Sequence, residues 1–355
     1  MSDRVVIDGA EGEGGGQIVR SSLTLSLVTG RPISLRNIRA RRNNPGLQRQ
    51  HLAAVKAAAA IGDADVRGAD VGSSSLDFTP RVVRGGDHTF EIGTAGSTTL
   101  VAQTVIPALL TAPEPSTLRI EGGTHNPLAP PFEFLDACYL PLLRRLGPRV
   151  SAKLVKHGFF PRGGGRIEVR IDPTEELRPF DLLERGAPRT SEVKAIVAGL
   201  PRHIADREVR TVCEELGWPP LSALVEEARA PSKGNVVWAR LDFENLSELC
   251  VAFGRLGVPT EEVAREVVAQ VLRYQSHSAP VGEHLADQIL LPLGLAVWRN
   301  GRQSGDDQAK ATATFRTGPL SDHTRTHIEL LRSFLEIAIQ VEGDHTGEEI
   351  AIRIG

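Results

Sequence analysis

Cysteine is scarce in this chain of 355 residues, which contains only Cys138, Cys213 and Cys250. No two of them lie close together in the sequence or form a CxxC pair. This spacing argues against a disulfide framework and against a structural zinc site. It favours a reducing compartment, and we expect a cytoplasmic protein.

Long hydrophobic runs are also absent. No stretch of about 18 uncharged apolar residues occurs, so we expect no transmembrane helix. Asp3, Arg4 and Asp8 stand where a signal peptide needs apolar residues, so we expect no secretory signal.

The chain has no excess of positive charge, because 41 Lys and Arg residues face 44 Asp and Glu residues, for a net charge of −3. A protein that coats nucleic acid through a broad basic face is normally more basic. Any contact with nucleic acid should therefore be local, as for a strand end held in a pocket. The hydrophobic fraction of 41% is ordinary for a globular protein and excludes a disordered chain.

Several nucleotide-binding and catalytic motifs are missing as well. The sequence has no GxxxxGK[ST] loop, no HExxH, no GxSxG, and no GxGxxG followed by a Rossmann pattern. Its histidines are not spaced as a metal cluster. If the protein uses ATP, a P-loop is not what binds it.

One structural unit recurs three times, at residues 14–61, 93–146 and 281–340. Each copy has a glycine-containing turn, an apolar helix, a strand and a second, amphipathic helix. In the third copy we expect the strand over 311–316 and the last helix over 322–340. Since each unit has an apolar helix face that it cannot bury alone, three packed units would form one core.

Residues 184–277 interrupt this repetition with strand and helix patterns of their own. Before them, alternating stretches at 151–156 and 166–171 predict a hairpin. The sequence therefore predicts an α+β fold built from α/β repeats. Its large domain would comprise residues 1–183 and 278–355, with a small α/β domain inserted at 184–277, in line with the length of the chain.

A glycine-rich run at residues 8–20 is the first candidate for an anion site. Its backbone N–H groups can converge, and the positive end of the following helix favours a phosphate. Glu11 and Glu13 in the run would need a metal ion or a cationic partner, and Arg20 lies one turn into the helix. A tight strand-to-helix turn is the alternative.

An arginine cluster at residues 36–51 is the second candidate. Guanidinium groups match phosphate oxygens, and this cluster stands out in an otherwise acidic chain. The alternative is a solvated basic loop.

Two later segments carry polar groups at helix starts. His284, Asp287 and Gln288 share one face of a predicted helix at 283–292, as a ligand site or as an internal hydrogen-bond network. At residues 321–327, Ser321 or Asp322 can cap a helix whose first turn contains His323. That position suits a nucleophile that attacks a phosphate, although a histidine at a cap is more often structural.

Together these segments resemble the RNA 3′-terminal phosphate cyclase family. The resemblance covers nearly the whole chain, through DGAEGEGGGQIVRSSLTLS, PGLQRQHLAAVKAA, IGTAGSTTLVAQTVIPALL, GGTHNPLAPPFEF, KHGFFPRGGG, VAGLPRHIADRE, GEHLADQILLPL and HTRTH. It implies three repeated units, each like the C-terminal domain of translation initiation factor 3, with a small domain inserted before the third.

The resemblance also implies an activity, that of a ligase which forms phosphoric ester bonds. A histidine would attack ATP to form a histidine–AMP intermediate, with Mg²⁺ or Mn²⁺ required. AMP would pass to an RNA 3′-phosphate, giving RNA(3′)pp(5′)A. The vicinal 2′-OH would then expel AMP and leave a 2′,3′-cyclic phosphate.

The resemblance assigns roles to residues in this sequence. His323 would be the nucleophile, and Glu13 would help to hold the metal ion. Phosphate and RNA contacts would come from Arg20, Arg42, Gln50 and His51. The ATP site would comprise Gln103, Pro131, His284, Leu285, Ala286, Asp287 and Gln288. Pro131 and the His284 ring would sandwich the adenine.

Two departures from the family pattern leave alternatives open. Many members have an aromatic residue at the position of His284, and members commonly have Asn where this chain has His327. His327 is therefore an alternative nucleophile, although His323 fits the motif better. A non-catalytic ribosome-assembly relative, which lacks the active-site histidine, and an enolpyruvyl transferase, which shares the repeat architecture, are alternative functions.

Overall fold

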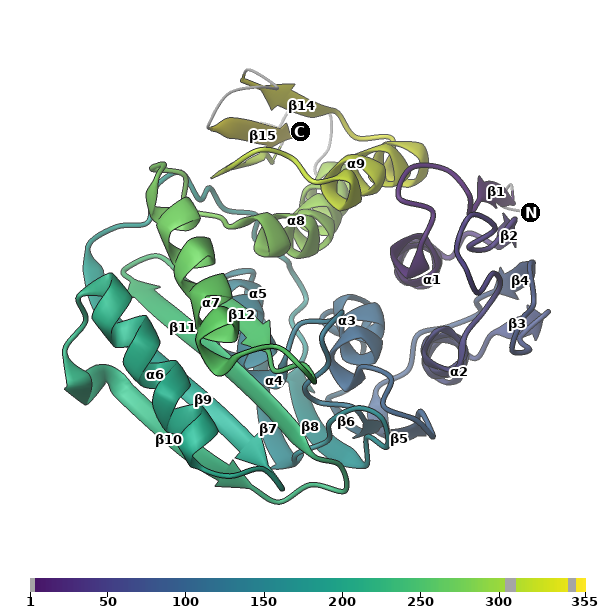
Figure 1. Cartoon of the computed structure of the whole chain (residues 1–355). Helices are drawn as coiled ribbons and strands as arrows, with labels where there is room; N and C mark the ends of the chain where they lie inside the picture. Colours follow the sequence, from purple (N-terminus) through teal and green to yellow (C-terminus); the bar gives the residue numbers. More distant parts are fainter. Residues whose placement is uncertain (1–3, 304–310, 344–348) are drawn as a thin grey trace.

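The computed structural model describes residues 4–303, 311–343 and 349–355. Residues 1–3, 304–310 and 344–348 of the predicted large domain lie outside the described residues. The structure is a mixed α/β arrangement of four separate sheets with helices packed between and against them (Figure 1). This confirms the mixed α/β character of the predicted fold.

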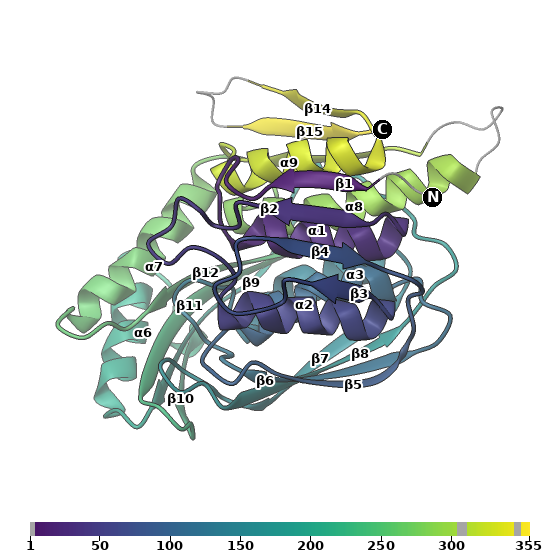
Figure 2. The ribbon, with the colours of Figure 1, turned by 90° about the vertical axis from the view of Figure 1, so that its right-hand side faces the viewer.

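The first unit begins at the N-terminal strand. Its elements are β1 (Val5–Asp8), α1 (Gly16–Thr29), β2 (Ile33–Arg36), α2 (Arg49–Gly62), β3 (Asp65–Arg67) and β4 (Leu76–Thr79). The sheet has the order β1-β2-β4-β3, in which β1 and β2 are parallel and the other pairs are antiparallel. Helices α1 and α2 lie behind this sheet in Figure 2. Helix α1 ends at Thr29 and is capped by Gly30, whose φ of 71° a residue without a side chain adopts without strain.

The second unit repeats this topology. Its elements are β5 (Gly86–Glu91), α3 (Thr98–Leu109), β6 (Ser116–Gly122), α4 (Phe132–Phe134), α5 (Leu140–Arg145), β7 (Arg149–Lys156) and β8 (Gly165–Asp172). The sheet order is β5-β6-β8-β7, again with the first pair parallel and the others antiparallel. Strands β7 and β8 confirm the predicted hairpin.

The third unit has a divided first strand. Its elements are α8 (Glu283–Gln303), β13 (Ala313–Thr317), α9 (Asp322–Leu335), β14 (Ile339–Glu342) and β15 (Ile350–Ile354), and its sheet order is β13-β15-β14. Single parallel bridges join Leu182 to Phe315 and Val281 to Thr317. The two bridges lie beside β13 as strand β1 lies beside β2 in the first unit and as β5 lies beside β6 in the second. The three units therefore share one pairing scheme, while the likeness to translation initiation factor 3 stays a prediction.

The segment between those two bridges forms its own sheet. It contains β9 (Pro188–Ala198), α6 (His203–Leu216), β10 (Ala223–Ala228), β11 (Gly234–Phe243), β12 (Ser247–Phe253) and α7 (Thr260–Gln275), and its sheet order is β10-β9-β11-β12. Helices α6 and α7 lie side by side on one face of this sheet, over a separate apolar cluster (Figure 1). The other face packs through Ile196, Val236 and Trp238 on the main core. The exact domain boundaries stay a prediction.

The helix predicted over 322–340 is wrong at its C-terminal end. Helix α9 ends at Leu335, because Glu336 adopts the left-handed conformation with φ 54°, and Gln340 lies in strand β14. The alternating apolar residues Ile339 and Val341 fit a half-buried strand better than a helix. Among the described residues, no helix is long and apolar enough to cross a membrane.

The buried Glu208 on α6 should make the free energy of unfolding depend on pH. Its side chain is fully buried, Oε2 accepts a hydrogen bond of 2.8 Å from Asn235 Nδ2, and Oε1 has no hydrogen-bond partner among the described residues. Burial raises the pKa of Glu208 to about 7, although the Asn235 hydrogen bond opposes this. The folded protein thus keeps a proton that the unfolded chain releases near pH 4.3, roughly the ordinary pKa of glutamate.

The free energy of unfolding should therefore fall as the pH rises from about 4 to about 7, since the folded state binds more protons across this window. Glu208→Gln removes the titration and should be more stable than the wild type by about 1–3 kcal/mol at pH 8, with little difference near pH 4. Urea unfolding at both pH values measures this. An equally steep pH dependence in the variant would contradict the assignment.

Candidate active site

The first turns of four helices meet at one place. Gln17 at the start of α1 contacts His323 at the start of α9 and Asp287 in the first turns of α8. His51 at the start of α2 lies against Gly16, where an added Cβ would overlap its Nε2 atom. Helix N-termini carry partial positive charge and unsatisfied N–H groups. Their convergence therefore forms a region suited to anions such as phosphate.

His323 is held by a side-chain amide. Its Nδ1 atom lies 2.8 Å from Gln17 Oε1, an atom that can only accept a hydrogen bond. Nδ1 therefore carries the proton, and Nε2 keeps its lone pair. The side chain is 51% exposed, and Ser321 caps the helix by accepting a hydrogen bond of 3.2 Å from the Thr324 N–H. The geometry leaves Nε2 as the ring nitrogen that Gln17 does not engage, on a side chain that is half exposed.

Gln17 also connects His323 to the buried polar groups below it. Its Nε2 donates to Asp287 Oδ2 at 3.1 Å, which fixes the orientation of the amide. Burial raises the pKa of Asp287 to about 7, against the charge of Arg20. Gln17 was not among the predicted site residues, although its place directly after Gly14, Gly15 and Gly16 was a signal for it.

His327 differs from His323 in its surroundings. It is buried, and its Nδ1 donates a hydrogen bond to the Asp287 carbonyl oxygen at 2.7 Å. The Gln17 amide nitrogen lies 3.4 Å from the same Nδ1. Because both of these nitrogens then carry hydrogen, this contact is not a hydrogen bond. Burial lowers the pKa of His327 to about 4, which leaves it neutral. A buried imidazole bonded to a helix backbone is suited to support the site, whereas the half-exposed His323 is suited to attack a ligand.

Glu13 brings the glycine-rich loop and the arginine cluster together. Arg42 forms an ion pair with Glu13 Oε1 and donates to the Glu13 carbonyl oxygen at 3.0 Å. The Glu13 N–H donates to Thr326 Oγ1 at 3.0 Å, which ties the loop to helix α9. Glu13 Oε2 lies 3.8 Å from His323 Nδ1 and has no hydrogen-bond partner among the described residues, although it is buried.

This orphaned oxygen bears on metal binding. No group of three or more His, Cys, Asp or Glu side chains within the described part of the chain is placed to hold a metal ion. Mg²⁺ commonly binds through one or two carboxylates together with substrate phosphates and water. Glu13 therefore fits a metal ion that arrives with a nucleotide, and does not fit a cage built from protein ligands alone.

Arg20 on α1 and His51 on α2 lie next to Gly16 in the glycine-rich run, and Gln50 precedes His51 in the sequence. Burial lowers the pKa of Arg20 to about 10, so its guanidinium stays charged at neutral pH. Burial, with Arg20 and Arg39 nearby, lowers the pKa of His51 to about 3. His51 Nδ1 accepts a hydrogen bond from the Gln48 N–H at 3.1 Å, so Nε2 carries the proton and can donate. Gln50 Oε1 accepts from the Ser97 N–H at 2.7 Å and joins the first unit to the second.

The residues predicted to bind ATP lie in several environments. Gln103 and Gln288 are hydrogen-bonded to each other, which joins α3 to α8. His284 is exposed at the start of α8, and Pro131 is buried where α4 begins. Leu285 and Ala286 are buried, and Asp287 is hydrogen-bonded to Gln17 as described above. The adenine sandwich stays a prediction.

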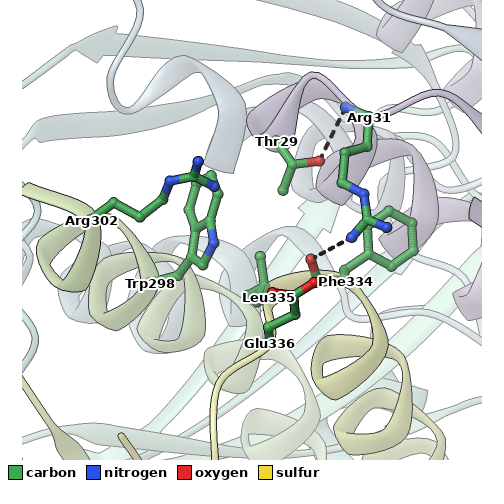
Figure 3. Close-up of a pocket in the computed structure, with 7 residues that line it drawn as sticks. All are labelled: Thr29, Arg31, Trp298, Arg302, Phe334, Leu335 and Glu336. Carbon is green, nitrogen blue, oxygen red and sulfur yellow. Dashed lines mark hydrogen bonds between the residues drawn. The ribbon is translucent and has the colours of Figure 1, made fainter. Parts of the chain in front are cut away.

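A separate cavity lies at the C-terminal ends of α1, α8 and α9 (Figure 3). It has a volume of about 380 Å³ and is lined by Thr29, Arg31, Trp298, Arg302, Phe334, Leu335 and Glu336. Arg31 donates to the Phe334 carbonyl oxygen at 3.0 Å, and its guanidinium lies 5.9 Å from the Phe334 ring centroid. The cation stabilises the carbonyl end of α9. Arg31 therefore fixes the far end of the helix that carries His323.

An accessible imidazole beside charged and helix-end donors is typical of enzymes that transfer phosphate-bearing groups, here on a mixed α/β fold of repeated units. Comparison with known families shows that the chain belongs to one such group: residues 11–341 match the model described as RNA 3′-terminal phosphate cyclase, and the chain is a member of that family.

Named relatives agree with this membership. A protein from Koribacter versatilis named RNA 3′-terminal phosphate cyclase is 42% identical, over 98% of this chain and 94% of its own length. One of the same name from Pseudomonas fluorescens is 46% identical, over 95% of this chain and 94% of its own length. Among solved structures, an EPSP synthase from Acinetobacter baumannii matches with 11% identity over 99% of this chain and 64% of its own, and its TM-score of 0.31 is too low to carry an argument.

Proposed function

We propose that this protein is an ATP-dependent RNA 3′-phosphate cyclase that works through a covalent histidine–AMP intermediate. The observation that carries the proposal is the hydrogen bond of 2.8 Å by which Gln17 fixes the His323 imidazole, with Nε2 free to attack. The family membership supports the same reaction. We further propose that residues 184–277 are an inserted domain. The buried free thiols Cys138, Cys213 and Cys250 support a reducing, cytoplasmic location.

In the first step His323 Nε2 attacks the α-phosphorus of ATP. The new N–P bond replaces the bond to the β-phosphate oxygen, and diphosphate leaves. The imidazole becomes positively charged as it is adenylylated, and its Nδ1 proton stays on the hydrogen bond to Gln17. Arg20 and the helix N-termini stabilise the charge that develops on the phosphates. A divalent ion bound to ATP would neutralise further phosphate charge, with Glu13 as its protein ligand.

In the second step an oxygen of the RNA 3′-phosphate attacks the phosphorus of the bound AMP. The N–P bond breaks, His323 regains its lone pair, and RNA(3′)pp(5′)A forms. The 2′-OH of the terminal ribose then attacks the 3′-phosphorus, gives up its proton, and expels AMP. Arg42 and the neutral His51 would hold the RNA phosphate through charged and N–H donors, and Gln50 would do so through its amide.

The alternative of a non-catalytic ribosome-assembly relative is not favoured. That branch lacks the active-site histidine, whereas this chain has His323 in an oriented and accessible position.

Three RNA ends test the function directly. An RNA with a 3′-phosphate should become resistant to phosphatase and release one AMP, because the neighbouring 2′-OH is held in position to attack. The same RNA with a 2′-O-methyl terminal ribose should stop at RNA(3′)pp(5′)A and accumulate it. An RNA with a 3′-OH should not react, because it offers AMP no phosphate. Phosphatase resistance without retained AMP in the 2′-O-methyl RNA would contradict the cyclase assignment.

A further inference from the structure

An exposed aromatic residue marks a surface that the proposed chemistry does not use. Phe160 lies in the loop between β7 and β8 and is 69% exposed, whereas its neighbour Phe159 is only 3% exposed. The Gly163 N–H donates to the Phe159 carbonyl oxygen at 2.8 Å, which closes a tight loop over residues 159–163. A flat apolar ring displayed in this way is suited to stack on a nucleic-acid base.

The loop is held firmly from both sides. The Phe159 ring stacks on His125 with 5.1 Å between ring centroids, and it packs so tightly on Gly234 that an added Cβ there would overlap the ring. The Arg162 N–H donates to Ser232 Oγ at 3.1 Å, and Ser232 belongs to the loop between β10 and β11. The tip therefore sits on the junction between the second unit and the inserted segment, with little conformational freedom left to lose on binding.

Positive charge lies on the two loops that meet here, at Arg162 beside Phe160 in the sequence and at Arg229 and Lys233 between β10 and β11. Arg162, Arg229 and Lys233 are exposed, and none of the three forms an ion pair with a carboxylate in the described part of the chain. The nearest acidic residues on β10 are engaged elsewhere, since Glu226 pairs with Lys194 at 2.6 Å and Glu227 with Arg202 at 3.4 Å. Unpaired cations beside an exposed aromatic ring form the pattern that binds single-stranded nucleic acid.

The loop also adjoins the proposed phosphate site. A Cβ on Gly163 would lie 2.6 Å from the Thr94 carbonyl oxygen, and a Cβ on Gly96 would lie 3.0 Å from Gln50 Cβ. The loop at residues 93–97 therefore contacts both the tip and Gln50, which neighbours His51. An RNA strand whose terminal phosphate lies at the proposed site can reach Phe160 across this one loop.

A groove beside the glycine-rich loop and helix α9 has the wrong charge for RNA. It has a volume of about 1050 Å³ and runs between β1 and α9. Its lining carries four carboxylates and two guanidiniums, from Asp8, Glu11, Asp322, Glu329, Arg325 and Arg332. Phosphates would be repelled there, so the electrostatics direct the strand towards the Phe160 side.

We infer that Phe160, Arg162, Arg229 and Lys233 form a platform for the RNA strand upstream of its 3′-phosphate. One base stacks on Phe160, and the three cations contact backbone phosphates. The inserted segment supplies two of the cations, which gives it a part in substrate binding. This inference rests on the proposed cyclase function and extends it from the reacting end to the body of the substrate.

The test uses the full chain and a ten-nucleotide RNA with a 3′-phosphate and a 5′-fluorescein. Phe160→Ala should raise the KM for this RNA about 5- to 140-fold, the range that corresponds to base stacking of about 1–3 kcal/mol. Phe160→Tyr keeps a stacking ring and should stay close to the wild type. Adenylylation of the protein by ATP should be unchanged in both variants, which shows that the fold and the ATP site are intact.

The cations are tested by the salt dependence of binding to the same RNA. Replacing Arg162, Arg229 and Lys233 together by Ala should reduce the slope of log Kd against log salt concentration by about 2, since each contact to a single strand contributes about 0.7. Leu221→Ala and Arg210→Ala are matched controls, because both residues are exposed on the inserted segment away from the loop, and neither should change KM or the slope.

The outcomes separate the two proposals. If the wild type cyclises this RNA and the platform variants keep its KM and its salt slope, the platform is refuted and the cyclase stands. If Phe160→Ala loses adenylylation as well, the residue serves the fold or the ATP site, and the platform is again refuted. A wild type that does not cyclise the RNA overturns the proposed function itself.

Discussion

His323→Ala protein should take up no label from ATP radiolabelled at the α-phosphate, whereas the wild type should become labelled with AMP. The reason is that the variant has no nitrogen at the position from which Nε2 attacks phosphorus. The label on the wild type should be stable in base and lost in acid, because a P–N bond hydrolyses once its nitrogen is protonated. Gel autoradiography after acid or base treatment measures both properties.

His327→Asn is the matched control for this experiment. Asparagine keeps an N–H group that can donate to the Asp287 carbonyl oxygen, the bond that His327 makes at 2.7 Å. The variant should therefore retain labelling, while its buried site loses some packing. Two results would assign the role of nucleophile to His327 instead: normal labelling of the His323→Ala protein, or a loss of labelling in the His327→Asn protein alone.

Gln17→Ala should slow adenylylation on the order of 100-fold, with a smaller effect on the KM for ATP. Without the Oε1 acceptor at 2.8 Å, the His323 ring is free to rotate and to move its proton to Nε2, where the lone pair is needed. Residues that orient a reacting histidine through its second nitrogen typically contribute factors of 10–100 or more. Single-turnover labelling over a range of ATP concentrations separates the rate from KM.

Two further variants make this result interpretable. Gln17→Glu keeps an acceptor for His323 but replaces the amide donor to Asp287 by a carboxylate, so it should recover only part of the rate. Gln340→Ala, an exposed glutamine on β14, should behave as the wild type. A Gln17→Ala variant with full activity would show that the amide does not position the nucleophile.

Much of the fold was visible in the sequence because its signals are local. Helices α1, α3 and α8 are long apolar segments that follow glycine-containing turns, and Ser321 was recognisable as a helix cap. The short strands β1 and β5 were missed, since four to six residues with polar neighbours carry little periodicity. The end of α9 was missed because the left-handed conformation of Glu336 has no sequence signature of the kind that glycine provides.

The candidate site was predictable by parts but not as an arrangement. The glycine-rich run, the arginine cluster and His323 each stand out in the sequence. Their contacts join residues far apart, as Gln17 and His323 are separated by 306 positions and Glu13 and Arg42 by 29. Only the packing of the three units determines which side chain faces which, so the orienting role of Gln17 became apparent only from the structure.

The sheet order of the third unit determines when helix α9 can be fixed in place as the chain is synthesised. Strand β15 is the middle strand, with β13 and β14 on either side, so neither edge strand pairs within this sheet until Ile350–Ile354 is present. Helix α9 joins those two edge strands and carries His323. During synthesis from the N-terminus, the glycine-rich loop before α1 is therefore made more than 300 residues before β15, the strand that completes the support of helix α9. An unfinished chain without β15 can offer the glycine-rich loop but no anchored His323, so under the proposed mechanism self-adenylylation requires that β15 has been made and has folded.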